Sequence, residues 1–241
     1  MEMPTDIQHQ AMGYDRTATM FSPEGHLLQV EYAEKAVRLG SASIGMVCSD
    51  GVLIIADKRL DDSLIVKESA NKIYEIDSHI ILSVAGIVAD ARVLVERAQV
   101  LAQQHRVTYD SPAEPELIVK EISNIKQQFS QYGGARPFGV SLMIAGVRNK
   151  KPELYTTSVT GNYFSYHANA IGENDEKIKE KLREKYKKEL TIKKGVRLAL
   201  DIFKEIQKDK FNLERFELAY IKNDSEGIKR FESGKLKEFI K

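Results

Sequence analysis

Strand-type and helix-type segments follow one another in long blocks along this chain rather than alternating one by one. Aliphatic, β-branched runs occupy residues 44–84, helical periodicity occupies 87–129, and strand-type runs return at 138–171. A second helical block covers 173–206, and strand-type residues close the pattern at 216–231. Blocks segregated in this way are typical of α+β proteins. We therefore expect two antiparallel sheets packed face to face, with helices on the outside.

Two hairpins are predicted in the first strand block. Asp50-Gly51 favours the positive φ angles of a tight turn, so Ile44–Cys48 should pair with Val52–Ala56. The second expected pair is Lys72–Ile76 with Ile80–Val84. We expect both hairpins to share one sheet.

An amphipathic helix is predicted at about residues 26–39, between the turn Ser22-Pro23-Glu24-Gly25 and Gly40. Further helices are expected from Ile87, over Leu117–Phe129, over Glu173–Leu190, and after Thr191 as N-cap. The remaining strands are expected at Phe138–Val147, Glu153–Thr157, Tyr163–Ile171, Phe216–Lys222 and Ile228–Phe231, with a short helix to Lys241.

The charge balance excludes a strongly basic protein. The 241 residues include 36 Lys and Arg against 35 Asp and Glu, with a single Cys. No apolar run reaches the ~20 residues that cross a bilayer.

Residues 173–241 hold 20 basic and 15 acidic side chains, so a nucleic-acid-binding module is one alternative. Glu173, Glu176, Glu180 and Glu184 interrupt any basic stripe there, and we expect a cytoplasmic protein with no nucleic-acid or membrane partner.

The first 21 residues are short of apolar side chains and show no periodicity. Such a segment is expected to be mobile when isolated. No Ser/Gly linker and no internal repeat divides the rest. We expect a mobile segment at residues 1–21, followed by one domain at residues 22–241.

Metal and cofactor sites are not indicated. The five His residues lack ligand spacing, and Cys48 stands alone on an apolar strand, where it should be a core residue. No phosphate-binding loop or dinucleotide motif is present. We expect neither a metal nor a cofactor.

Ser41 is a candidate nucleophile because it heads a predicted strand near Asp57-Lys58 and Lys72. An N-terminal nucleophile enzyme uses such a hydroxyl together with the free amine of the same residue. Here 40 residues precede Ser41, so its nitrogen is acylated unless the chain cleaves itself after Gly40. That cleavage would remove the well-formed helix at 26–39. A self-processing amidohydrolase is therefore the less favoured hypothesis, and Lys58 and Lys72 taken alone would be solvated lysines.

Three N-terminal motifs resemble the signature of proteasome α-type subunits, most closely the archaeal form. They are Tyr14-Asp-Arg16, Phe21-Ser-Pro-Glu-Gly25 and Leu28-Gln-Val-Glu-Tyr-Ala33. Gly51–Lys58, Gly86–Arg92 and Tyr132–Ser141 also look like the family's blocks. The resemblance implies a four-layer αββα sandwich of the N-terminal-nucleophile hydrolase type, which agrees with the layers expected from periodicity.

The function implied by the resemblance is that of a non-catalytic subunit of the proteasome core particle. Seven copies would form a homo-heptameric outer ring stacked on β subunits, which hold the catalytic threonines. The ring would admit unfolded protein substrates to the chamber and would dock the C-terminal tails of a hexameric regulatory ATPase. Ser41 follows a retained helix, and this departure from catalytic subunits argues against peptidase chemistry in this chain.

Three groups of residues match functional positions of the family. Tyr14, Asp15, Arg16, Pro23 and Tyr32 match the gate region, where a tyrosine, a carboxylate and a proline turn hold the open form. Lys72 and Gly86 match the pocket that receives the C-terminal carboxylate of the activator. The loop that lines a constriction below the gate is matched by Tyr132, Gly133, Gly134 and Ala135.

Overall fold

The computed structural model describes residues 12–59, 64–66, 69–224, 227–232 and 236–240, and in them two five-stranded antiparallel sheets. The first sheet runs, in spatial order, through β10 (Lys229–Phe231), β9 (Phe216–Lys222), β2 (Gly51–Asp57), β1 (Ser43–Cys48) and β8 (Ala168–Ile171). The second runs through β3 (Ile73–Asp77), β4 (Ile80–Gly86), β5 (Val140–Arg148), β6 (Lys151–Thr157) and β7 (Tyr163–Ser165).

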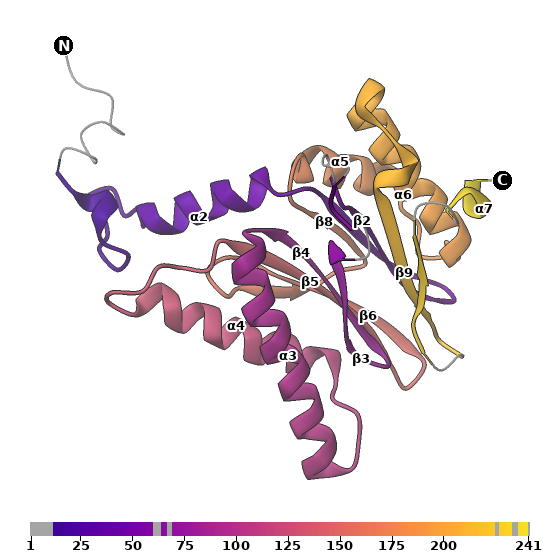
Figure 1. The fold of residues 1–241 in the computed structure, drawn as a ribbon, viewed down its shortest axis with the longest axis horizontal. Helices are drawn as coiled ribbons and strands as arrows, with labels where there is room; N and C mark the ends of the chain where they lie inside the picture. Colours follow the sequence, from indigo (N-terminus) through magenta and orange to yellow (C-terminus); the bar gives the residue numbers. More distant parts are fainter. Residues whose placement is uncertain (1–11, 60–63, 67–68, 225–226, 233–235, 241) are drawn as a thin grey trace.

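Helices cover the outer face of each sheet (Figure 1). The second sheet is covered by α3 (Val88–Tyr109) and α4 (Pro115–Gln131). The first sheet is covered by α5 (Asp175–Lys185), α6 (Ile192–Gln207) and α7 (Lys237–Ile240). The expected four-layer αββα sandwich is therefore confirmed. Short 3-10 turns lie at η1 (Tyr14–Arg16), η3 (Lys208–Lys210) and η4 (Leu213–Arg215).

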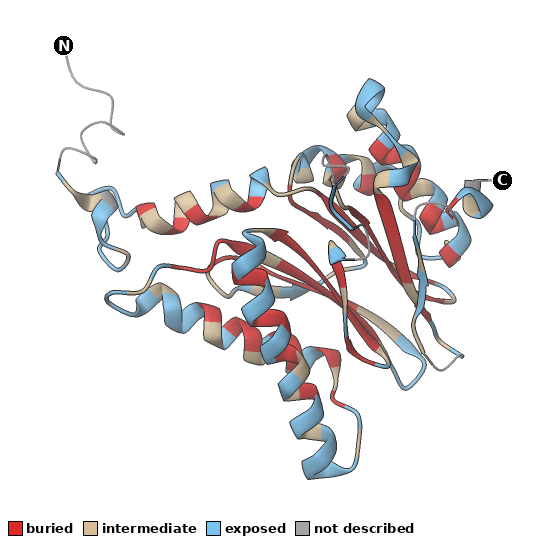
Figure 2. Cartoon of the chain, in the orientation of Figure 1, coloured by how far each residue is buried: buried red, intermediate tan, exposed pale blue. Residues whose placement is uncertain are grey.

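The central strands are buried on both faces because each sheet lies between two layers, whereas the edge strands β7 and β10 are largely exposed (Figure 2). In β2, Leu53 and Ile55 pack toward the helices, whereas Val52, Ile54 and Ala56 pack between the sheets. This division follows from the two-residue period of a strand. Cys48 is buried in the helix-facing cluster, as expected for a core residue.

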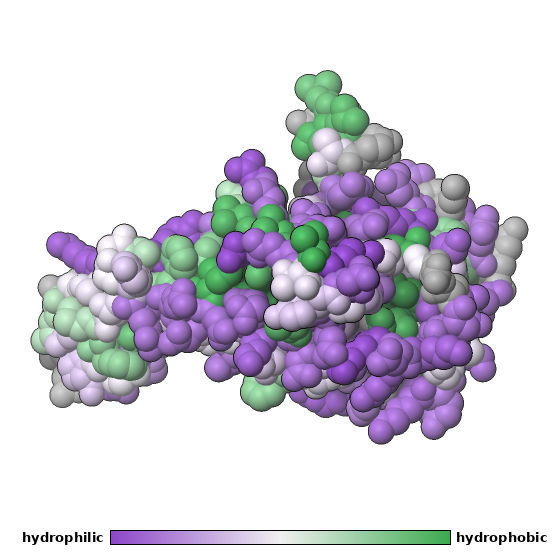
Figure 3. Space-filling view, turned by 90° about the horizontal axis from the view of Figure 1, so that it is seen from below, coloured by the Kyte–Doolittle hydropathy of each residue, from purple (hydrophilic) through white to green (hydrophobic). Residues whose placement is uncertain are grey.

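The helix α2 (Leu28–Leu39) joins this core although it lies outside both sheets. Val30, Ala33 and Val37 belong to the apolar cluster between the sheets. Figure 1 shows α2 leading away from the sheets to η1 at one end of the molecule. Figure 3, seen from below, shows a largely hydrophilic face with apolar side chains gathered near its middle and at a projecting tip.

One prediction about the sheets was wrong. The hairpins β1–β2 and β3–β4 both form, but they lie in different sheets. The reason is long-range pairing, since β2 pairs with β9 and β4 pairs with β5.

Two predicted segments are shorter than expected. The predicted strand Tyr163–Ile171 is two strands, because β7 pairs with β6 in one sheet and β8 pairs with β1 in the other. The predicted helix Glu173–Leu190 ends at Lys185, where the Tyr186 hydroxyl donates a hydrogen bond to the Val47 carbonyl.

Thr191 does occupy the N-cap position of α6, yet its side chain makes no cap hydrogen bond. The Asp50 carboxylate accepts from the Ile192 N–H instead, at 2.7 Å. None of the described helices is long and apolar enough to cross a membrane.

Candidate functional site

The first motif of the N-terminal signature, Tyr14–Arg16, forms one turn of 3-10 helix, η1, that packs against α2. Gly13 precedes the turn at φ 77°, and the Arg16 N–H donates to the Gly13 carbonyl at 3.1 Å. Positive φ is a conformation that glycine adopts without strain. The structure therefore brings η1, which contains Tyr14 and Asp15, close to α2, the helix that carries Tyr32. Residues 1–11 of the expected gate segment lie outside the described residues.

The proline turn between η1 and α2 is closed by Ser22. Gly25 donates its N–H to the Ser22 carbonyl at 2.8 Å and has φ 84°. The buried Ser22 hydroxyl accepts from the His26 N–H at 3.1 Å. Pro23 is exposed in this turn, and the Lys35 ammonium lies 5.4 Å from the centre of the Tyr32 ring. The predicted gate residues thus lie on η1, in the turn that precedes α2, and on α2 itself.

Lys72 and Ser41 meet across 31 positions of sequence. The Lys72 Nζ lies 2.8 Å from the Ser41 Oγ and also donates to the Ser41 carbonyl. The Asp57 carbonyl is a third partner, at 3.4 Å. Lys72 is only 9% exposed, so the expectation of a solvated lysine was wrong. Burial lowers the pKa of Lys72 to about 7, although the charges of Asp57 and Glu217 oppose the shift.

The two carboxylates near Lys72 are occupied by other partners. Asp57 accepts from the Arg215 Nη2 at 2.8 Å and from the Gln207 Nε2 at 2.9 Å. Glu217 accepts from the backbone N–H groups of Lys72 and Ile73, at 2.6 and 2.7 Å. Within the described residues, no carboxylate forms an ion pair with the Lys72 ammonium. The cost of burying the charged form of this amine is therefore not offset by a direct contact with an opposite charge.

Gly86 borders the same segment from the other side. A Cβ at Gly40 would collide with the Gly86 nitrogen, so the two backbones are in close contact. Gly86 has φ 121°, and its own added Cβ would collide with the Gly139 carbonyl. The structure therefore brings Lys72 and Gly86 together at Gly40-Ser41. Glycine at position 86 is required by backbone packing, a role that the sequence did not indicate.

The nitrogen of Ser41 is acylated by Gly40, and this peptide is fixed on both sides. Gly40 donates its N–H to the Val37 carbonyl at 3.0 Å. Its own carbonyl accepts from the Glu173 N–H at 2.7 Å. The site thus contains a hydroxyl and an amine of lowered pKa, but the α-amine of an N-terminal nucleophile is missing.

The predicted constriction loop follows α4 directly. The Tyr132 side chain is 72% exposed, and the Ala135 N–H donates to the Tyr132 carbonyl at 3.3 Å. No atom lies within 4 Å of a Cβ built on Gly133 or on Gly134. The tip of the loop therefore projects into open space.

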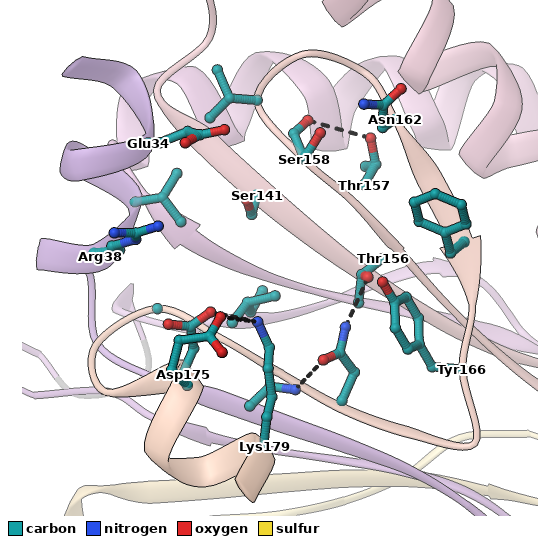
Figure 4. Close-up of a pocket in the computed structure, with 18 of the residues that line it drawn as sticks. Glu34, Arg38, Ser141, Thr156, Thr157, Ser158, Asn162, Tyr166, Asp175 and Lys179 are labelled. Carbon is teal, nitrogen blue, oxygen red and sulfur yellow. Dashed lines mark hydrogen bonds and ion pairs between the residues drawn. The ribbon is translucent and has the colours of Figure 1, made fainter. Parts of the chain in front are cut away.

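A polar cleft of about 350 Å³ lies apart from all these residues (Figure 4). Glu34 and Arg38 of α2 lie on one side and Asp175 and Lys179 of α5 on another, while residues between Thr156 and Gly172 line most of the rest. The Lys179 ammonium donates to the Asp175 carboxylate at 2.6 Å. None of the functional-site residues predicted from the sequence lines this cleft. Its lining combines α2, α5 and the segment from β6 to β8, which are separate in the sequence, so no local motif could have indicated it.

The described residues contain no group of three or more His, Cys, Asp or Glu side chains placed to hold a metal ion.

Comparisons with known proteins cover nearly the whole chain. The family model described as "Proteasome subunit" matches residues 37–221, and the model of the N-terminal signature of A-type proteasome subunits matches residues 14–36. The chain is 42% identical over 229 residues to the proteasome alpha subunit of Archaeoglobus fulgidus, a match that covers 95% of this chain and 93% of the relative. For the same subunit of Methanopyrus kandleri the identity is 39% over 234 residues, with 97% and 94% covered. The Pyrococcus abyssi subunit is 42% identical over 228 residues, with 95% and 87% covered.

Proposed function

This chain belongs to the proteasome subunit family as an α-type subunit of the core particle, and from that premise we propose that it gates the particle and cleaves nothing itself. Seven copies form the outer ring, which stacks on β subunits and admits unfolded protein to their chamber. Residues 22–241 form the body of the subunit, whereas residues 1–21 are the gate segment. The ring works in the cytoplasm and docks a hexameric ATPase through the C-terminal tails of that enzyme.

The observation that carries this proposal is the burial of α2 in the core. Val30, Ala33 and Val37 are each at most 9% exposed. Fully burying a valine side chain stabilises a fold by about 1.5–3 kcal/mol. Cleavage after Gly40 would release all three from the core. A fold that holds the residues before Ser41 keeps the Ser41 nitrogen acylated and therefore without a catalytic amine.

The gate follows from the position of the N-terminal segment. A head-to-tail contact that closes on itself forms a ring, and a ring places identical segments around one axis. A short polar segment with little core of its own can block a pore and move aside at low cost in free energy. The turn at Pro23 then joins this segment to α2, and the 3-10 turn at Tyr14–Arg16 lies within the segment.

The docking pocket is formed by Lys72 and Gly86 at the Gly40-Ser41 segment. A terminal carboxylate of the activator would accept from the Lys72 ammonium in a charge-assisted hydrogen bond. In the isolated chain this amine is bonded to Ser41, so the carboxylate must replace or join these partners. Docking is therefore coupled to the protonation of Lys72.

The experiment that tests the gate is deletion of residues 1–19 in a core particle reconstituted with a β subunit. The deletion should raise the rate at which a fluorogenic tetrapeptide is hydrolysed, because passage through the ring limits that rate in the intact particle. Ring assembly, checked by electron microscopy, should be unchanged. An unchanged hydrolysis rate in assembled particles would contradict the gate assignment.

A second candidate function is a self-processing amidohydrolase that uses Ser41. The observation that favours it is the 2.8 Å contact between the Lys72 Nζ and the Ser41 Oγ. Intact mass spectrometry of the purified chain separates the two functions. A species that begins at Ser41 would support the enzyme, whereas a chain that retains α2 supports the gate.

A further inference from the structure

Arg136 and Asp90 form a bidentate ion pair at the base of the loop Tyr132–Ala135. The Arg136 Nη1 lies 2.6 Å from the Asp90 Oδ2, and the Nη2 lies 2.7 Å from the Oδ1. Paired N–H groups that face both carboxylate oxygens fix the plane of the guanidinium as well as its distance. The Nη1 also donates to the Pro137 carbonyl at 3.0 Å. Arg136 is thus held in one orientation directly after the loop.

Asp90 is rigidly placed to receive this arginine. Its side chain is only 10% exposed, on the first turn of α3. The Oδ2 also accepts from the Gly139 N–H at 2.8 Å, and the Gly139 carbonyl accepts from the Ile87 N–H at 2.9 Å. Burial raises the pKa of Asp90, but the bonds from Arg136 and Gly139 outweigh it and leave the pKa below its ordinary value. The carboxylate therefore joins the start of α3 to both ends of the Arg136–Gly139 segment.

The tip of the loop has few contacts that could orient it. Gly133 and Gly134 have open space where a Cβ would stand, and Tyr132 is largely exposed. The other end of the loop is the last turn of α4, and the Phe129 ring of that helix lies 4.7 Å from the Phe138 ring, which follows Arg136 in the sequence. The direction of the tip thus depends on its two ends, and the Arg136–Asp90 pair is the polar anchor of one of them.

We propose that Arg136 and Asp90 are positioning residues for the passage of extended, unfolded polypeptide, because their ion pair aims the loop Tyr132–Ala135. This inference rests on the proposed constriction, which places the loop in the path of the substrate. A loop released from Asp90 samples many orientations, and in some of them Tyr132 obstructs the passage. A long chain must keep contact with the loop throughout transit, whereas a tetrapeptide passes it once.

Mobility of the loop is measured first, by electron paramagnetic resonance of a nitroxide at Gly133→Cys. Position 133 has room for the label, and the native Cys48 thiol will not react because it is buried and its pKa is raised to about 12. Labelled chain is diluted with unlabelled chain so that labels in one ring do not interact. Asp90→Asn keeps the shape and the acceptor for Gly139 but loses the charge, and Arg136→Gln removes the other partner. Both should mobilise the label, and Arg136→Lys should do so less.

Transit is measured second, in reconstituted particles that lack residues 1–19, so that the gate does not limit the rate. Degradation of an unfolded protein should fall by about threefold or more in Asp90→Asn and Arg136→Gln, while tetrapeptide hydrolysis stays within about twofold. The matched control is Arg92→Gln, which breaks the exposed Arg92–Glu96 pair that begins two residues after Asp90 on α3. It should change neither readout.

The two measurements test separately whether the ion pair holds the loop and whether the loop lies in the path of the substrate. An immobile label in both variants would overturn the inference, since the pair would not hold the loop. A mobile label with unchanged protein degradation would also overturn it, because the loop would then lie outside the path. In that second case the gate could still be intact, and the 1–19 deletion tests the gate independently.

Discussion

The Lys72 Nζ is buried 2.8 Å from the Ser41 Oγ, and no carboxylate among the described residues forms an ion pair with it. Its other two partners are the carbonyl oxygens of Ser41 and Asp57, which can only accept. A neutral amine has two N–H donors and one lone pair, which suits two carbonyls and one hydroxyl. An ammonium has three donors and would use the hydroxyl as an acceptor. Both forms are accommodated, and the pKa of about 7 places both near neutral pH.

Replacing Lys72 with Met should abolish stimulation by the regulatory ATPase without preventing ring assembly. Loss of a charge-assisted hydrogen bond costs about 1.5–3 kcal/mol, or roughly 10- to 150-fold in affinity for the terminal carboxylate. The measurement is the Kd of a peptide with the activator's C-terminal sequence. Lys58→Met is the matched control, because the Lys58 Nζ donates to Asn71 rather than to Ser41. Equal affinities for Lys72→Met and the unmodified chain would remove Lys72 from the pocket.

Docking should weaken as the pH rises above neutrality. The carboxylate requires the ammonium, and the free pocket loses this proton near pH 7 because burial outweighs the attraction of Asp57 and Glu217, while Arg59 adds to the lowering. The Kd should therefore rise by up to about tenfold per pH unit above 7, until the pKa of the bound state is reached. Lys72→Arg keeps its charge and should flatten this dependence. A flat pH profile for the unmodified chain would show that the amine is already charged.

Turns and hairpins could be predicted where their conformation depends on residues that are close together in the sequence. The Asp50-Gly51 turn confirms this, because the residues that pair across it lie within a few positions of one another. Sheet membership is different, since it depends on pairs such as Ile54 with Ala219, which no local pattern connects. The end of α5 was missed for the same reason: the hydroxyl of Tyr186 bonds to Val47, on a distant strand.

The candidate site was predictable in its residue types but not in its geometry. The family resemblance based on Tyr14-Asp-Arg16 and the following motifs is confirmed by the matched ranges. The burial of Lys72 was missed because lysine is rarely buried, and its hydroxyl partner, Ser41, lies 31 positions away in the sequence. The roles assigned to the gate, pocket and loop residues remain predictions.

Gly86→Ala should destabilise the fold as well as the pocket. Its φ of 121° is strained for any other residue, and the new Cβ would collide with the Gly139 carbonyl. We expect a loss of about 2 kcal/mol or more in the free energy of unfolding. Gly133→Ala, which meets open space, should change stability by less than about 0.5 kcal/mol. Thermal unfolding at fixed protein concentration compares the two, and a Gly86→Ala chain as stable as the control would limit Gly86 to a docking role.

Lys126→Met should change how stability depends on pH. Lys126 is a fully buried residue of α4, and its ammonium donates to the Val140 carbonyl at 2.9 Å. Burial lowers the pKa of Lys126 from 10.5 to about 7. Between these two values the unfolded state binds more protons, so the free energy of unfolding rises with pH. The slope from this one group approaches about 1.4 kcal/mol per pH unit.

The Lys126→Met variant should lose that slope, and the exposed Lys120→Met on the same helix should keep it. Denaturant titrations at several pH values between about 7.5 and 9.5 measure the difference. Parallel pH profiles for Lys126→Met and the unmodified chain would mean that Lys126 stays charged in the fold.

The most direct test of the central claim is peptide hydrolysis by reconstituted core particles that carry Ser41→Ala in this chain. The account predicts the same rate as for the unmodified particle, complete loss of activity when the nucleophile of the β subunit is removed, and no cleavage by this chain alone. Loss of hydrolysis in an assembled Ser41→Ala particle, together with a chain that begins at Ser41, would contradict it.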